Sequence, residues 1–297
     1  MLYERQKHLL ALVNALGGEI GALDFQKLLL LYCLEEAESP LFEFVPYKYG
    51  GFSFTSYADK RRLIEKGLFI DEDRTWTLTA DGKAMTTTVA MQIATLRFAK
   101  RYAGLRGNEL IIETYRRYPY YAIHSEMVDR LMAGDSQMMK AIAEARPGKG
   151  EPGLYTIGYE GRTLEGFLNA LILSKVTLLC DVRQNPISRK YGFSKSTLKK
   201  SCAGVGIQYE HLPELGIPSE NRRNLTSQED YNSVFEAYVR KILPSQANKM
   251  TAISDWIKKG ERVALTCYEK LPAQCHRSYL AKEMERRFGR VCTPKHL

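Results

Sequence analysis

The sequence lacks long apolar runs, a secretion-type leader and a regular cysteine framework. Its leucine-rich run LLLLYCL is far shorter than the roughly 18 apolar residues that a membrane span needs. The first ten residues hold no basic segment followed by an apolar core, so we expect no signal peptide. Six cysteines are scattered along 297 residues, three of them inside apolar runs, which indicates buried, reduced thiols. We therefore expect a cytoplasmic protein without membrane association.

Internal repeats, low-complexity tracts and a nicotinamide fingerprint are also missing. GYEGRTLEG, which begins at Gly158, is only loosely similar to a glycine-rich dinucleotide loop, and its glycine spacing is wrong. We therefore expect no cofactor. With 44% hydrophobic and 26% charged residues, the composition is that of a globular protein, and the length allows two domains.

Positive charge is concentrated in the second half of the chain. The formal net charge is +9; residues 1–150 hold 20 basic and 19 acidic residues, and residues 151–297 hold 23 and 15. This distribution is typical of a module that binds a polyanion. A basic surface kept for solubility is the simpler alternative.

A linker separates the two halves. The segment RPGKGEPG, residues 146–153, contains two prolines and three glycines. We predict a mainly helical domain at residues 1–146, a linker at 147–153 and an α/β domain at 154–297.

The first half has the element order of a winged helix. Apolar spacing predicts helices over residues 3–16 and from Asp24 onward, and TSYADKRRLIEKG predicts a third helix that ends at Gly67. LFIDEDRTWTLTADGKA then indicates two short strands around a charged turn. We predict a winged-helix-like domain on this basis.

This stretch resembles the Panacea-type antitoxin-like domain through DFQKLLLLYCL, FVPYKYGGFSF and the segment Leu63–Phe69. The resemblance covers about residues 1–85 and implies a targeting or regulatory module with a protein partner. In a winged helix, Lys60, Arg61 and Arg62 would lie on or beside the recognition helix and contact phosphates. Because this half is nearly neutral, a pure protein–protein module is the alternative.

Four apolar strands alternate with helical patterns in the second half, at 154–159, 177–183, 207–213 and 262–269. They predict a Rossmann-like α/β domain with a mainly parallel sheet. Ligands bind at the carboxyl ends of such strands, so we expect one shared crevice there. The side chains at or just after these ends are Tyr159, Glu160, Asp181, Arg183, His211, Cys267 and Glu269.

The motif CYEKLPAQCHR predicts an anion site at a helix start. The turn at Pro272 brings Cys275, His276 and Arg277 to the opening of a helix, whose backbone N–H groups attract anions. The same position would lower the pKa of Cys275. Glu269 becomes an acid–base candidate if burial raises its pKa.

Two other interpretations of this motif carry less weight. Cys267, Cys275, His276 and His211 suit zinc, but Cys-x7-Cys-His is no standard finger spacing and adjacent ligands rarely share one ion, so we expect no metal. A cysteine nucleophile lacks the glycine-rich loop of cysteine phosphatases. We expect Cys275 to pack while His276 and Arg277 face a phosphate.

The segment NPISRKYGFSKSTLKK interleaves aromatic and basic residues, which suits stacking on bases while cations hold the backbone. A solvated helix face with the two aromatic side chains packed beneath it is the alternative. The residues concerned are Ser188, Arg189, Lys190, Tyr191, Phe193, Lys195, Lys199 and Lys200, with Arg222 and Arg223 as a second basic cluster.

The second half resembles the domain-of-unknown-function family numbered 488. GYEGRTLEGFL, CDVRQNPISRKYGFS, YEHLPELG and CYEKLPAQCHR follow one another in the family's order across residues 154–288. The resemblance implies a Rossmann-like domain with nucleic-acid or nucleotide chemistry. The family pattern falls on Gly158, Tyr159, Asp181, Arg183, Pro186, Ser188, Arg189, Tyr209, His211, Glu269, Cys275, His276 and Arg277.

Together these features predict an enzyme that cleaves a glycosidic or phosphodiester bond in DNA, RNA or a nucleotide. The predicted catalytic residues are Asp181, His211, Glu269, Tyr159 and Cys275. The predicted phosphate-binding residues are Arg183, Ser188, Arg189, Lys195, His276, Arg277, Arg222 and Arg223. The alternative is a non-catalytic nucleic-acid-binding regulator with an antitoxin-like N-terminal module.

Overall fold

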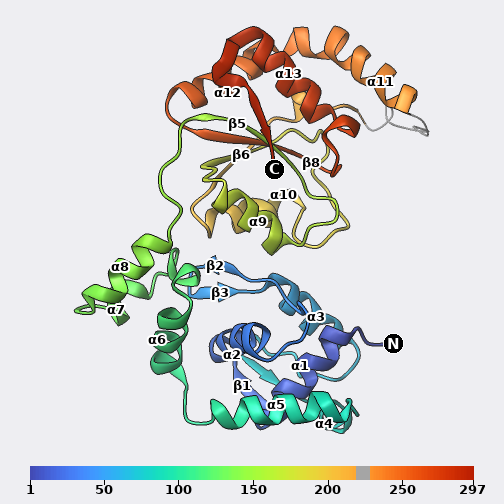
Figure 1. The fold of residues 1–297 in the computed structure, drawn as a ribbon. Helices are drawn as coiled ribbons and strands as arrows, with labels where there is room; N and C mark the ends of the chain where they lie inside the picture. Colours follow the sequence, from blue (N-terminus) through green and yellow to red (C-terminus); the bar gives the residue numbers. More distant parts are fainter. Residues whose placement is uncertain (219–227) are drawn as a thin grey trace. The chain divides into compact units, whose positions relative to one another are not determined.

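The computed structural model describes residues 1–218 and 228–297 and divides the chain into two compact units, Met1–Arg146 and Pro147–Leu297. The N-terminal unit is mostly helical, and the C-terminal unit holds a five-stranded parallel sheet (Figure 1). Each unit has a hydrophobic core of its own. Within the described residues, no helix has both the length and the apolar character to cross a membrane.

The N-terminal unit combines helices with two small antiparallel sheets, β1–β4 and β2–β3. Its helices are α1 (Glu4–Ala15), α2 (Ala22–Glu35), α3 (Phe54–Glu65), α4 (Ala80–Ala84), α5 (Val89–Arg101), α6 (Gly107–Arg117), α7 (Val128–Leu131) and α8 (Ser136–Ala145). Its strands are β1 (Glu19–Gly21), β2 (Val45–Tyr47), β3 (Gly50–Phe52) and β4 (Thr75–Thr77).

Helix α2 is the centre of this unit's core. The leucines of LLLLYCL from Leu28 to Leu31 are fully buried, because α2 packs against α6 and β3 as well as β1 and β4. A helix that is apolar on all sides is stable only where neighbours surround it. The run that is too short for a membrane span is therefore a core helix.

The predicted pair of strands around the charged turn is only partly present. β4 is a strand, but it pairs with β1, and Phe69 contributes a single bridge to Leu78. Lys60 lies beside this turn, and its buried ammonium donates to the carbonyl oxygens of Glu72 and Thr75, which ties the turn to α3. Lys60 is thereby occupied, so the prediction that it contacts phosphate is wrong.

The C-terminal unit has the mainly parallel sheet that the sequence predicts, in the order β7-β6-β8-β5-β9 with every described pair parallel. Its strands are β5 (Gly153–Gly158), β6 (Leu178–Asp181), β7 (Gln208–His211), β8 (Arg262–Cys267) and β9 (Pro294–His296). Its helices are α9 (Leu164–Leu173), α10 (Lys195–Ala203), α11 (Gln228–Ala237), α12 (Ala247–Lys258) and α13 (His276–Phe288).

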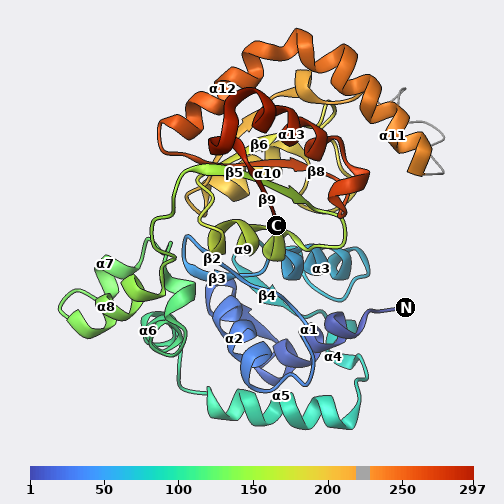
Figure 2. The same cartoon turned by 45° about the horizontal axis from the view of Figure 1, so that its top comes forward.

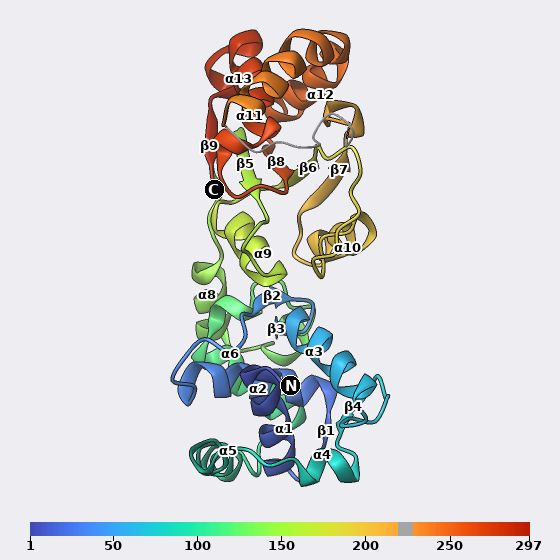
Figure 3. The same ribbon diagram turned by 90° about the vertical axis from the view of Figure 1, so that its right-hand side faces the viewer.

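Helices cover both faces of this sheet. Figures 2 and 3 show α11, α12 and α13 on one face and α9 and α10 on the other. Successive side chains of a strand point to opposite faces. Leu178, Cys180 and Val182 accordingly pack into the core with α12 and α13, which leaves Asp181 for the face of α9 and α10. The carboxyl edge of the sheet therefore carries functional groups on two sides.

Candidate functional site

On the α9–α10 side of the edge, Asp181 is a fully buried carboxylate with both oxygens occupied. It accepts hydrogen bonds from the backbone N of Arg183 at 3.1 Å, from Nε and Nη2 of Arg183 at 2.8 and 2.5 Å, and from the Tyr209 hydroxyl at 2.7 Å. Charge-assisted, bidentate pairs of this kind fix geometry strongly. The arrangement favours a positioning role for Asp181 over the predicted acid–base role.

Arg183 is held equally firmly. Its Nη1 donates to the Tyr159 hydroxyl and to the Phe193 carbonyl oxygen, both at 2.9 Å, and its guanidinium lies 5.0 Å from the centre of the Tyr159 ring. Burial alone would lower the pKa of Arg183, but the bonds and charge of Asp181 raise it above the usual value. The Phe193 ring is buried and stacked on Tyr159 at 4.4 Å, so the prediction that it stacks on a base is wrong.

His211 links this cluster to the solvent-exposed Lys195. Its Nε2 lies 2.9 Å from the carbonyl oxygen of Arg183, and its Nδ1 lies 2.9 Å from Nζ of Lys195. A carbonyl oxygen only accepts and an ammonium only donates, so these two contacts fit the tautomer with the ring proton on Nε2. His211 can act as a base through Nδ1 only after Lys195 moves away.

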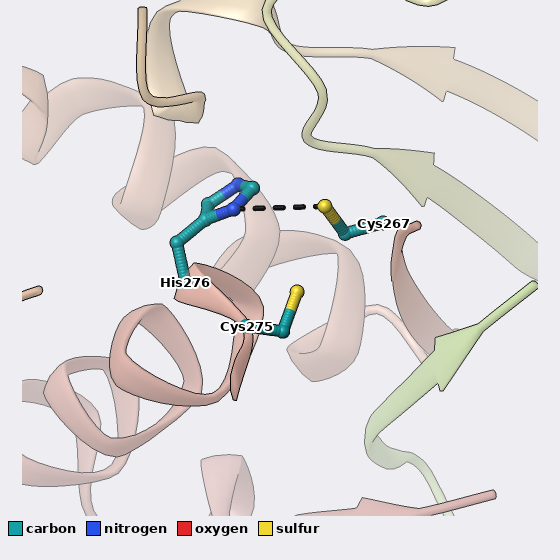
Figure 4. Close-up of side chains that lie close together, drawn as sticks. All are labelled: Cys267, Cys275 and His276. Atoms are coloured by element: carbon teal, nitrogen blue, oxygen red, sulfur yellow. Dashed lines mark hydrogen bonds between the residues drawn. The ribbon is translucent and has the colours of Figure 1, made fainter. Parts of the chain in front are cut away.

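On the α13 side, Cys267, Cys275 and His276 form a buried cluster (Figure 4). Cys267 ends β8, and Cys275 is the N-cap of α13, directly before His276. Sγ of Cys267 lies 3.6 Å from Nδ1 of His276, whose Nε2 lies 3.1 Å from the carbonyl oxygen of Val182. His276 is therefore bound to the protein backbone. The prediction that it faces a phosphate is wrong.

Glu269 adjoins this cluster, and its pKa is lowered and not raised as we expected. The Cys267 thiol donates to Oε2 of Glu269 at 3.3 Å. Burial alone would raise the pKa of Glu269, but hydrogen bonds from Cys275, from the backbone and from Cys267 bring it below the usual value. Glu269 is thus a carboxylate, suited to accept a proton.

Cys275 also differs from the expectation. Complete burial raises its pKa well above the ordinary thiol value, and neighbouring Cys267 adds to the shift. The helix start does not overcome this desolvation, so the prediction of a lowered pKa is wrong. A thiol of this kind is a poor nucleophile.

Arg277 stabilises the loop that carries Glu269. Its Nη1 donates to the carbonyl oxygen of Glu269 at 2.6 Å and its Nη2 to that of Lys270 at 3.1 Å. The residue is buried, and its Nε has no hydrogen-bond partner in the described part of the chain. Arg277 consequently positions Glu269 instead of meeting phosphate directly.

Backbone contacts join the two clusters into one site. Val182 and Arg183, adjacent in the chain after β6, accept bonds from His276 and His211 respectively. The end of β5 touches the end of β8 so closely that a Cβ on Gly158 would lie 1.9 Å from the Glu269 carbonyl oxygen. The structure thus brings the ends of β5, β6, β7 and β8 together.

Exposed cationic and aromatic side chains occur in the loops after β6 and β8 and on α10. Tyr191 and Tyr268 keep 38% and 46% of their surfaces exposed. Ser188 shapes the loop after β6, because its hydroxyl accepts from the Lys190 backbone and its own N–H donates to Ser194. The exposed cations are Arg189, Lys195, Lys199, Lys200 and Lys270. Arg222 and Arg223 lie outside the described residues.

Two tyrosines were absent from the predicted catalytic and phosphate-binding residues. Tyr209 donates to Asp181, and Tyr268 stands exposed between Cys267 and Glu269. The alternation of side chains between the two faces of a sheet could have identified them. Tyr209 lies two residues before His211 and so shares its face, and Tyr268 points away from its buried neighbour Cys267. The sequence did not indicate which face each strand turns inward.

The C-terminal unit is thus an α/β domain with a parallel sheet and a polar cluster at the carboxyl edge of its strands. The family described as Domain of unknown function DUF488 matches residues 163–284, which include both clusters apart from Tyr159 and its neighbours. No curated protein and no solved structure matches the chain.

Proposed function

We propose that the C-terminal unit binds a nucleic acid or a nucleotide at the carboxyl edge of its sheet and cleaves a glycosidic or phosphodiester bond there. The observation that carries this proposal is the set of exposed cations and tyrosines in the loops after β6 and β8 and on α10, in the same unit as the buried polar cluster. Cations neutralise phosphates, and exposed aromatic rings stack on bases. In this proposal Glu269 is the catalytic base, while Asp181, Arg183 and Arg277 hold the framework in place.

Binding is tested by a salt titration with labelled single- and double-stranded DNA and RNA. Double substitution Arg189→Glu and Lys195→Glu should weaken binding and reduce the slope of log K against log salt by about one for each cation that no longer binds a phosphate. Lys258→Glu together with Lys259→Glu is the matched control, since both are exposed lysines at the end of α12, at the opposite edge of the sheet. Equal weakening by the control substitution would contradict a specific surface.

Catalysis is tested on the same samples with a denaturing gel that includes an alkali step to reveal abasic sites. Glu269→Gln should abolish the product band and leave binding intact, because the amide keeps the shape of the side chain and cannot accept the proton. Full turnover by this variant would refute the role of Glu269.

A non-catalytic regulator is the second candidate. The observation in its favour is that Asp181, Arg183, His276 and Arg277 are all committed to internal bonds. In this case nucleic acid is bound without any product, and Glu269→Gln leaves binding unchanged or tighter.

For the N-terminal unit we infer a winged-helix-like module that targets or regulates the C-terminal unit and has a protein partner. The order of α1, β1, α2, α3 and β4, with the pairing of β1 and β4, supports this inference. The nearly even balance of charge in residues 1–150 supports a protein contact over tight DNA binding.

A further inference from the structure

We propose that Cys267, Cys275 and His276 bind a zinc ion at the end of β8. Their donor atoms all lie within 4.8 Å of one another, and all three side chains are buried. Thiolate and imidazole are donors that zinc prefers, whereas magnesium and calcium take oxygen donors. This inference goes beyond the proposed function and does not depend on it.

The measured spacing fits one ion between the donors. Zinc lies about 2.3 Å from a thiolate and about 2.0–2.1 Å from an imidazole nitrogen, so in a tetrahedral site these two donors are about 3.5 Å apart. Sγ of Cys267 and Nδ1 of His276 are 3.6 Å apart. The sequence objection, that Cys275 and His276 are adjacent, fails because the first is the N-cap and the second the first residue of α13, so their side chains converge on Cys267 (Figure 4).

His276 is oriented as a metal ligand needs to be. The Val182 carbonyl oxygen, 3.1 Å from Nε2, can only accept a hydrogen bond, so the ring proton stays on Nε2. The lone pair of Nδ1 then points at the cysteines. Metal-bound histidines usually donate their other ring N–H to a carbonyl or carboxylate in this way.

Charge balance also favours this ion. Two thiolates and one neutral imidazole around Zn²⁺ form a site without net charge, which a buried position tolerates. On binding, the two S–H bonds break, two Zn–S bonds form, and both protons leave to the buffer without any change of oxidation state.

Glu269 lies beside these three side chains. In the metal-free state its Oε2 accepts from the Cys267 thiol at 3.3 Å. Once that thiol is a metal-bound thiolate, it has no proton to donate, so this hydrogen bond is lost when zinc binds.

The first test measures metal content of the full chain without any nucleic acid. Protein reconstituted with zinc and separated from excess ion should retain about one zinc per chain, and Cys267→Ser and Cys275→Ser should each abolish this retention. Cys202→Ser is the matched control, since Cys202 is a fully buried cysteine in α10 of the same unit. Full zinc content in both site variants would overturn the proposal.

The second test avoids misfolded variants because it uses the unchanged chain. Cobalt(II) added to metal-free protein should give the intense visible bands of a tetrahedral ion together with thiolate-to-cobalt charge transfer, and zinc should displace both. Absence of these bands, in protein whose six cysteines are all found reduced by thiol titration under denaturing conditions, would overturn the proposal. Because neither test uses nucleic acid, the metal site and the proposed function can fail separately.

Discussion

Asp181 and Arg183 show at the scale of single residues how a buried charge pair fixes the edge of the sheet. Asp181→Asn would leave the guanidinium of Arg183 buried with only neutral partners, and breaking a buried pair costs roughly 3–5 kcal/mol. We expect the free energy of unfolding of the C-terminal unit to fall by about this amount. Urea unfolding followed by the fluorescence of Trp256 on α12 measures it, in a chain whose other tryptophan, Trp76, is replaced by phenylalanine.

Asp255→Asn, on the helix α12 that also carries Trp256, is the control for Asp181→Asn. Asp255 pairs with Lys258 at 3.9 Å, and both side chains are about half exposed. Exposed pairs contribute at most about 1 kcal/mol. Equal destabilisation by Asp181→Asn and Asp255→Asn would mean that burial does not strengthen the first pair.

Lys27 makes a second residue-scale prediction, on pH. It is buried on α2, with Nζ 3.5 Å from the Gly51 carbonyl oxygen, and burial lowers its pKa to about 7 although Asp24 opposes the shift. An unfolded lysine has a pKa of about 10.4, so between pH 7 and 10 unfolding takes up a proton. The free energy of unfolding of the N-terminal unit should therefore rise with pH above 7 and be flat below it, as far as Lys27 determines it.

Lys27→Met should remove this rise and stabilise the unit at neutral pH, because the methionine carries no charge to bury. Unfolding between about pH 6 and pH 9, read from Trp76 in a Trp256→Phe background, provides the comparison. Lys48→Met is the control, since the Lys48 side chain is 51% exposed and should leave the pH dependence unchanged. A Lys27→Met variant that keeps the full rise would show that another group causes it.

At the scale of elements, the approach of β5 to β8 determines where Glu269 stands. A Cβ on Gly158 would lie 1.9 Å from the Glu269 carbonyl oxygen, a backbone atom that cannot yield as a flexible side chain can. Gly158→Ala should push the end of β8 outward, lower the thermal midpoint and reduce any turnover. Gly153→Ala, at the other end of β5, meets nothing closer than 3.9 Å and should behave like the unchanged chain.

The strands were predictable because each is an apolar run bounded by helical patterns. All four predicted strands of the C-terminal unit are present and parallel. β9 was missed because it has only the three residues Pro294–His296, of which two are polar and exposed. The other strand of the predicted wing is reduced to one bridge, Phe69 to Leu78, while β4 pairs with β1, a long-range pairing that no local pattern contains.

The sequence predicted which residues stand at the strand ends, but it did not predict the contacts that these residues make. Apolar runs ending in charge pointed to Asp181, His211 and Glu269, which the structure brings to one edge. The roles of the other site residues depend on burial. Arg277 is buried and donates to a carbonyl oxygen of the protein, and burial raises the pKa of Cys275. Which side chains are buried depends on how the helices cover the two faces of the sheet, and a single sequence does not reveal that arrangement.

At the scale of the whole molecule, the two units differ in fold and in net charge. Each has its own core, and nearly all of the excess positive charge lies in residues 151–297. We therefore predict that residues 147–297 alone fold and bind nucleic acid with the salt slope of the full chain, because that slope reflects the number of phosphates bound. Urea unfolding by Trp256 fluorescence and the salt titration check both statements. A smaller slope would mean that the N-terminal unit also binds phosphates, and higher turnover without it would mean that it restrains the C-terminal unit.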